Sequence, residues 1–284
     1  MRLSLGPTRQ LGDPAKLWSI LDGTPFDAVY LADHFSTSLP DPWTMLGHAA
    51  GLTSRIKLGT HVVGAPFHDP ARLAAQVATV DSLSGGRARL GIGAAHQRLD
   101  FEPYGYEYRS IGGRIDQMRD CIVTMKRLWT DSEVPFPAHV QQPHPPIIVG
   151  LNTAGRAMQV AVDHADGINT WQLGPQQVGE LRTHLADRGC ELERFEVTAD
   201  VLLRPGADQA EAERVAQAVA GASAAGGRGK AATHWDDSGV LWGDQARITD
   251  QVAAFAEAGV DELAVSGTLD DALWFAEHVI AQDG

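Results

Sequence analysis

The sequence predicts a (β/α)₈ barrel (a TIM barrel), an α/β fold in which eight parallel strands alternate with helices and close into a cylinder. Short apolar runs alternate with helix-like segments from one end of the chain to the other. These runs are apolar almost without interruption, which is typical of parallel strands buried on both faces. The length of 284 residues is common for a one-domain barrel. We therefore expect one domain over residues 1–284, with an open doubly wound sheet as the alternative.

The eight expected strands are the short apolar runs. They occupy residues 2–6, 28–32, 56–63, 88–93, 146–150, 167–170, 195–203 and 262–266. Residues 222–242 are rich in Ala, Gly and polar side chains, and we interpret them as an excursion before the last helix–strand–helix unit.

Helix signals lie between these runs. Asp69 and Pro70 are typical of an N-cap and a first helical position, and Gly85 supplies the stop. Ser110 is expected to cap a long helix, and Gly259 to end a later one.

The composition excludes several classes of partner. A net charge of −13 argues against nucleic acid and against an anionic membrane surface. No stretch approaches the ~20 apolar residues needed to span a bilayer, and Pro7 interrupts any leader-like run. The two cysteines form no CxxC or zinc spacing, so we expect reduced, buried thiols and a cytoplasmic protein.

Several familiar catalytic motifs are absent. Gly91 and Gly93 begin a dinucleotide fingerprint that lacks its third glycine, and the residues around Lys230 lack the rest of a phosphate-binding loop. The sequence has no G-x-S-x-G elbow and no HExxH, so neither a serine hydrolase nor a metal site is expected.

Polar residues instead follow the expected strands at the ends where they stop. They are Asp33 and His34, Thr60 and His61, His96 and Gln97, Asn152 and Thr153, and Asn169 to Trp171. Each alone is compatible with a hydrogen-bonded loop residue, and Asp33 with a turn cap. Because the carboxyl ends of barrel strands share one rim, their joint placement predicts an active site there.

Several segments, taken in order, resemble one family. They are 27–35 (DAVYLADHF), 40–44 (PDPWT), 53–60 (TSRIKLGT), the block 69–93, 101–105 (FEPYG), 114–116 (RID), 128–129 (LW), 145–150 (PPIIVG) and 165–167 (ADG). This pattern resembles the luciferase-like flavin and deazaflavin oxidoreductases, and it covers most of the first 171 residues.

The resemblance implies a barrel, a homodimer and a bound FMN or coenzyme F420. Asp33-His34 resembles the F420-dependent branch, in which the histidine lies beside the deazaflavin ring and handles a proton. The resemblance also implies a non-prolyl cis peptide at His61–Val62 that supports the ring. Cofactor contacts are expected from Asp33, His61, Val62, Gly64, Ala94, Ala95, Gly150, Asn152 and Thr153.

The sequence departs from the family pattern twice. His96 stands where many members have Trp or Glu, which argues against the sugar-phosphate dehydrogenase activity that uses that Glu. His96 is therefore a second candidate for the proton carrier. Asn152 and Thr153 follow Gly150 where many members have glycines, and they are expected to donate to a cofactor phosphate at the start of the next helix.

These observations leave three functions open. The first is an F420-dependent oxidoreductase that transfers a hydride to or from a small organic substrate. The second is an FMNH₂- and oxygen-dependent monooxygenase, and the third is a cofactor-binding protein without turnover. The substrate is set by loops such as 36–42 and 222–242 and is not readable from the sequence.

Overall fold

The computed structural model describes residues 1–6, 14–37, 39–225 and 238–281. Within these ranges the strands are β1 (Arg2–Leu5), β2 (Ala28–Leu31), β3 (Lys57–Thr60), β4 (Val63–Gly64), β5 (Ala88–Gly93), β6 (Ile147–Gly150), β7 (Gly167–Trp171), β8 (Glu196–Pro205), β9 (Val240–Gly243) and β10 (Glu262–Ser266). All of these strands pair in parallel, in the order β10-β1-β2-β3-β5-β6-β7-β8-β9.

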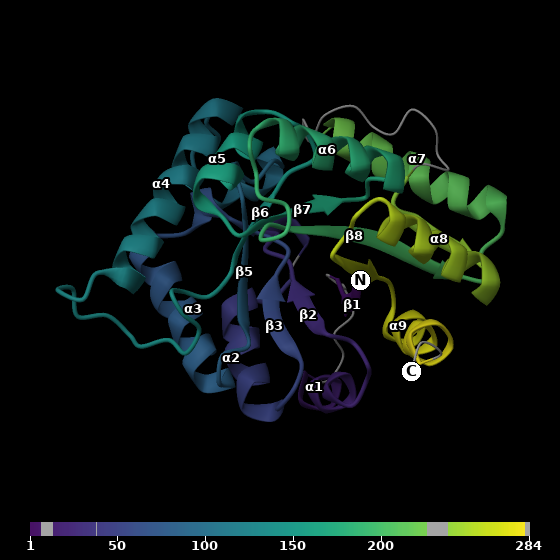
Figure 1. Ribbon diagram of the computed structural model, residues 1–284, viewed down its shortest axis with the longest axis horizontal. Coiled ribbons are helices and arrows are strands. Elements are labelled where there is room, and N and C mark those ends of the chain that lie inside the picture. Colours follow the sequence, from purple (N-terminus) through teal and green to yellow (C-terminus); the bar gives the residue numbers. More distant parts are fainter. Residues whose placement is uncertain (7–13, 38, 226–237, 282–284) are drawn as a thin grey trace.

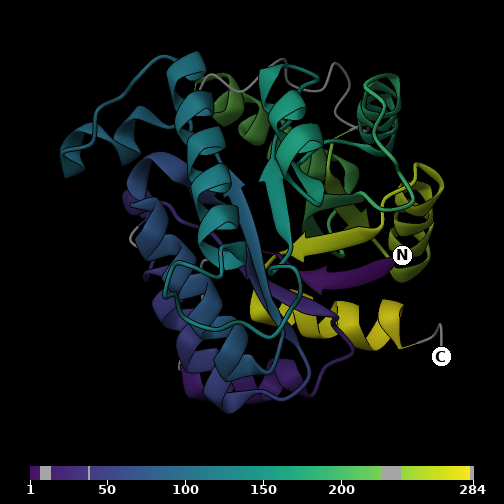
Figure 2. The same cartoon turned by 60° about the vertical axis from the view of Figure 1, so that its left-hand side comes forward.

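The sheet closes because β10 pairs with β8 as well as with β1. Eight of the described strands therefore form a closed barrel, which confirms the predicted fold. Figure 2 shows β1 and β10 side by side, although they come from opposite ends of the sequence. β4 continues the line of β3 along β5, and β9 extends the barrel beside β8.

Helices surround the barrel (Figure 1). They are α1 (Pro14–Asp22), α2 (Pro42–Leu52), α3 (Pro70–Ser84), α4 (Ile111–Thr130), α5 (Arg156–His164), α6 (Pro175–Asp187), α7 (Gln209–Ala225), α8 (Gln245–Glu257) and α9 (Leu269–Phe275), which continues as the π-helical turn η6 (Ala276–Ile280). None of the described helices is long and apolar enough to cross a membrane.

The predicted helix signals are confirmed. The Asp69 carboxylate accepts a hydrogen bond from the backbone N–H of Arg72 at the start of α3, and Gly85 ends that helix in the left-handed conformation. The Ser110 hydroxyl caps α4 in the same way, through the N–H of Gly113.

Three predictions need correction. The expected strand at 56–63 is interrupted at His61–Val62 and appears as β3 and β4. The expected excursion at 222–242 contains the end of α7 and most of β9, while 226–237 lie outside the described residues. A run as short as Val240-Leu241-Trp242 carries too little apolar pattern to be recognised as a strand. Cys121 is buried as expected, but Cys190 is only half-buried, in the turn after α6.

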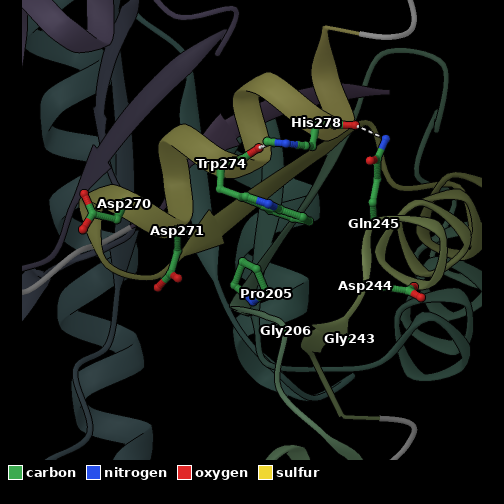
Figure 3. A pocket seen from close by; sticks show the side chains of 9 residues that line it. All are labelled: Pro205, Gly206, Gly243, Asp244, Gln245, Asp270, Asp271, Trp274 and His278. Atoms are coloured by element: carbon green, nitrogen blue, oxygen red, sulfur yellow. Dashed lines mark hydrogen bonds between the residues drawn. The ribbon is translucent and has the colours of Figure 1, made fainter.

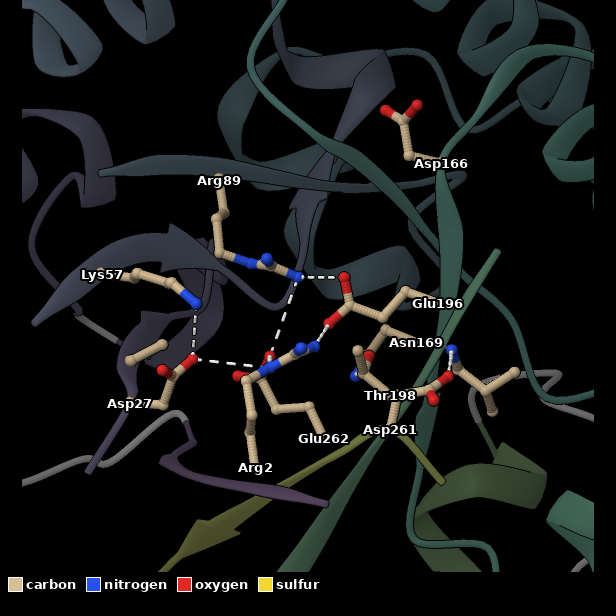
Figure 4. A network of polar contacts seen from close by, with 12 residues as sticks. Arg2, Asp27, Lys57, Arg89, Asp166, Asn169, Glu196, Thr198, Asp261 and Glu262 are labelled. Carbon is tan, nitrogen blue, oxygen red and sulfur yellow. Dashed lines mark hydrogen bonds and ion pairs between the residues drawn. The ribbon is translucent and has the colours of Figure 1, made fainter. Parts of the chain in front are cut away.

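The floor of the barrel, where the strands begin, is filled by a charged network (Figure 4). Glu262 is fully buried and accepts hydrogen bonds from the hydroxyls of Ser4 (2.6 Å) and Tyr30 (2.8 Å). Arg89 binds Glu196 at 2.6 Å and lies 3.7 Å from Glu262. Burial alone would raise the pKa of Glu262, but Arg89 and the Ser4 hydroxyl outweigh it and lower the pKa to about 2.

Candidate active site at the barrel mouth

The carboxyl ends of the strands bring the predicted residues to one rim. Asp33 and His34 follow β2, Ala94 to His96 follow β5, and Asn152 and Thr153 follow β6. The structure places the rings of His34 and His96 edge to face, with centroids 5.7 Å apart. The two candidate proton carriers, from different strand ends, are therefore neighbours.

His34 is held by a carboxylate that the sequence did not single out. Its Nδ1 lies 2.9 Å from Oδ2 of Asp100, and the other oxygen of Asp100 accepts from the backbone N–H of Ser36 at 2.8 Å. Burial would raise the pKa of Asp100, but the hydrogen bonds from His34 and Ser36 lower it. An ionised Asp100 favours a proton on Nδ1 of His34, which leaves Nε2 of a neutral ring as an acceptor.

The His34 ring is also positioned for access. Its side chain is 26% exposed, whereas that of Asp100 is 2% exposed. Among the described residues none forms a hydrogen bond to Nε2 of His34. A buried carboxylate that orients a partly open imidazole is an arrangement suited to proton transfer with a ligand.

Asp33 faces the protein rather than open solvent. Its carboxylate lies 2.8 Å from Nε2 of His68 and accepts a longer contact of 3.4 Å from the N–H of Gly64. Asp33 is buried, and its contacts with His68 and Gly64 join the end of β2 to the segment that begins with β4. In this position it fixes the backbone beside His34.

An aromatic cluster forms one wall beside His34. Phe35 packs against Phe67 and Tyr106, with ring centroids 5.3 and 5.7 Å apart. Phe67 in turn contacts Phe101 at 4.7 Å, and the hydroxyl of Tyr108 donates to the backbone oxygen of His96. Loops after β2, β4 and β5 are thereby packed together, and this packing gives the mouth a fixed shape on that side.

The expected cis peptide is present at His61–Val62, so this prediction is confirmed. Val62 then lies against two strand-end glycines. A Cβ atom at Gly93 or at Gly150 would come within 2.9 Å of a Val62 methyl carbon. Glycine is needed at both positions for the backbones to approach this closely, so Val62, Gly93 and Gly150 pack together where the strands end.

The start of α5 suits an anion. Its N-cap, Gly155, provides no side-chain hydrogen bond, and Thr153 is exposed just before it. Uncapped N–H groups at a helix N-terminus attract phosphates. Asn152 is partly committed elsewhere, because its side chain both donates to the backbone oxygen of Trp171 (2.8 Å) and accepts from the N–H of Trp171 (2.9 Å). Thr153 and the helix backbone are thus the more available donors.

A hollow lies on the rim between the ends of β8 and β9 and the start of α9 (Figure 3). Its volume is about 560 Å³, and Trp274, Asp244, Asp270 and Asp271 are among the residues that line it. Loops at this place often bind phosphate in barrels, but three carboxylates repel an anion. Asp244 and Asp271 serve as helix caps here. A cofactor phosphate therefore fits α5 better than this hollow.

Sequence analysis did not identify three residues of the site, and each of them belongs to a His–Asp pair. Asp100 holds His34, His68 binds Asp33, and Asp200 holds His61 at 2.9 Å. A signal existed for one of them, since Asp200 is a charged residue in the middle of the largely apolar run 195–203. Asp100 directly precedes the motif at 101–105, which offered a weaker signal.

A model of the luciferase-like monooxygenase family matches residues 15–262. An uncharacterised protein of Mycobacterium tuberculosis is 32% identical over 164 residues, which cover 54% of this chain and 56% of that protein. The oxygenase component of the flavin-dependent trigonelline monooxygenase of Acinetobacter baylyi is 28% identical over 224 residues, 72% of this chain and 61% of that protein. The chain thus spans little more than half the length of these curated relatives.

Solved structures agree on the fold. An F420-dependent secondary alcohol dehydrogenase in complex with an F420–acetone adduct superposes with a TM-score of 0.80 at 15% identity, over 99% of this chain and 97% of that one. The oxygenating constituent of 3,6-diketocamphane monooxygenase from Pseudomonas putida, in complex with FMN, gives 0.71 at 16% identity, over 99% of both chains. At these identities the similarity shows the fold alone.

Proposed function

Because this chain belongs to the luciferase-like monooxygenase family, we propose that it is a coenzyme F420-dependent oxidoreductase acting on a small organic substrate. The observation that carries the proposal is the His34–Asp100 pair, with Nδ1 and Oδ2 2.9 Å apart and the ring partly open at the mouth. In this pair, His34 of the Asp33-His34 motif can take up or release a proton.

The residues at the mouth have separable roles in this proposal. The bound deazaflavin supplies the hydride chemistry, and the protein supplies position and protons. Val62, Gly64, Ala94, Ala95 and Gly150 form the surface against which the ring lies, while Thr153 and the start of α5 hold its phosphate. His34 exchanges a proton with the substrate through Nε2, and Asp100 keeps the other nitrogen protonated. His96 is the competing proton carrier at the same place.

A second function is favoured by one comparison. The trigonelline monooxygenase component, which matches 72% of this chain, is described as flavin-dependent. The same mouth, with its apolar ring surface and its anion site, also suits FMN. The alternative is therefore a monooxygenase that uses reduced FMN and oxygen.

A cofactor titration separates the two. We expect coenzyme F420 to bind more tightly than FMN when tryptophan fluorescence is followed with each added separately. Trp171, at the end of β7 beside Asn152, is the expected reporter. Free N-acetyltryptophanamide, titrated in parallel, corrects for light absorbed by the cofactors. Equal or reversed affinities would contradict the F420 proposal and favour the monooxygenase.

We further propose a homodimer that works in the cytoplasm. The family resemblance supports the assembly, and two-fold dimers are the commonest soluble oligomers. Sedimentation at micromolar concentration is expected to give twice the 30.4 kDa of one chain. A species of the mass of one chain would contradict the dimer.

A further inference from the structure

A histidine and a carboxylate are enclosed together inside the barrel. Nδ1 of His61 lies 2.9 Å from Oδ1 of Asp200, and the two side chains are 0% and 1% exposed. Among the described residues, neither Nε2 of His61 nor Oδ2 of Asp200 has a hydrogen-bond partner. Buried polar atoms in proteins usually have a hydrogen-bond partner, so two unpaired atoms within one pair need an explanation.

The pair lies between the charged floor and the mouth. The His61 ring stacks flat on Tyr30, with centroids 3.5 Å apart and an interplanar angle of 7°. Tyr30 in turn donates to Glu262 of the floor network. On the other side, the residue after His61 is Val62, which packs on Gly93 and Gly150 at the mouth. His61 therefore directly precedes Val62, which belongs to the surface to which we assign the cofactor ring.

The charges around the pair do not compensate Asp200. At the floor, Arg2 and Arg89 face Glu196 and Glu262, so two positive charges balance two negative ones. β2 contributes Tyr30, whose pKa is raised by burial, and β7 contributes the neutral Asn169, whose amide lies 3.3 Å from Nδ1 of His61. Burial also raises the pKa of Asp200, against the opposing pull of His61 and Asn169. One proton shared by His61 and Asp200 would cancel the uncompensated charge of Asp200.

We propose that His61 and Asp200 act as a buried titratable unit beneath the cofactor ring, which takes up one proton when an anionic cofactor binds in the mouth. The cofactor part of this inference rests on the proposed function. The pair positions and balances the ring electrostatically rather than reacting with substrate. The physical reason is that charges in a closed interior are weakly screened, so a negative group above the pair favours its neutral, protonated state.

Calorimetry of cofactor binding tests the coupling. Coenzyme F420 and, separately, FMN are titrated into the wild-type protein in two buffers of different ionisation enthalpy at the same pH. We expect net proton uptake from the buffer, and a dissociation constant that rises by up to about tenfold per pH unit where the pair loses its proton. The uptake and this slope should be absent in Asp200→Asn and in His61→Gln.

His184→Gln is the matched control, because it removes a histidine from a different His–Asp pair, with Asp187 on α6, whose ring is 52% exposed. The uptake should persist in that variant. Titration of the cofactors themselves contributes equally to all the proteins, so the difference between variants isolates the pair. Equal uptake in wild type, Asp200→Asn and His61→Gln would overturn the proposal.

A measurement on the cofactor-free protein distinguishes a failure of the His61–Asp200 proposal from a failure of the proposed function. The ring signal of His61, assigned by its loss in His61→Gln, is followed by NMR against pH in the cofactor-free protein. We expect Asp200→Asn to change its titration, and Asp33→Asn to leave it unchanged. If wild type binds neither cofactor, the proposed function fails, while an unchanged His61 titration in Asp200→Asn separately overturns the pair. If Asp200→Asn does not fold, the uptake difference between wild type and His61→Gln decides.

Discussion

Replacement of His34 by glutamine is expected to lower turnover by about 10²–10⁴-fold, the usual contribution of a positioned general acid or base. Glutamine keeps a hydrogen bond to Asp100 but cannot titrate, so folding and most cofactor affinity should persist. Steady-state kinetics with a reacting substrate, together with the cofactor titration, measures the two effects separately. His34→Ala should give a similar loss of turnover.

Two comparisons assign the role. Asp100→Asn should lower turnover in the same direction, because an amide no longer favours the proton on Nδ1 of His34. His96→Ala should have a small effect if His34 is the carrier. A large loss in His96→Ala with a small loss in His34→Ala would exchange the two roles. Near-normal rates in both would mean that solvent or substrate supplies the proton.

Replacement of Glu262 by alanine is expected to reduce the free energy of unfolding by about 3–5 kcal/mol, the usual effect of breaking a buried charged network. Ser4 and Tyr30 would lose their acceptor, and the charge of Arg89 would lose part of its compensation. Denaturant unfolding followed by circular dichroism measures the change. Glu193→Ala, at an exposed glutamate, is the matched control and should stay within about 0.5 kcal/mol. A similar small change in Glu262→Ala would contradict the role assigned to the floor.

The same carboxylate predicts a pH dependence. Its pKa is about 2 in the folded protein, below the ordinary value of 4.5 that applies when the chain is unfolded. The unfolded chain therefore binds the proton first, so the contribution of Glu262 is fully present above about pH 4.5 and is lost as the pH falls toward 2. The stability difference between wild type and Glu262→Gln should accordingly shrink between pH 5 and pH 3, in unfolding curves at about 25 °C.

The barrel was predictable because its signals are local. Each apolar run stands between turn and cap residues, and Asp69 and Ser110 behave as their side-chain chemistry requires. β9 was not predictable in the same way, since Val240-Leu241-Trp242 is short and its pairing with β8 depends on residues more than thirty positions away. The break at His61–Val62 was reached only through the family resemblance.

The site was predictable in its location but not in its pairings. Parallel topology brings His34 and His96 to one rim, and both could be named from their positions after strands. The carboxylates that hold the histidines come from distant parts of the chain, since Asp100 is 66 positions after His34 and Asp200 is 139 positions after His61. Such pairings are set by three-dimensional packing, so a sequence pattern with a period of two or four residues carries no trace of them.

The closure of the barrel by β1 and β10 has a consequence for how the protein is made. Ser4 and its acceptor Glu262 are 258 residues apart in the chain. At the usual pace of about 5–20 residues per second on the ribosome, the first strand waits roughly 13–50 s before its second neighbour has been synthesised. During that time one edge of β1 is open to other strands, and the charge of Arg2 on that edge opposes unwanted pairing. The floor network can therefore be completed only after Glu262 has been synthesised.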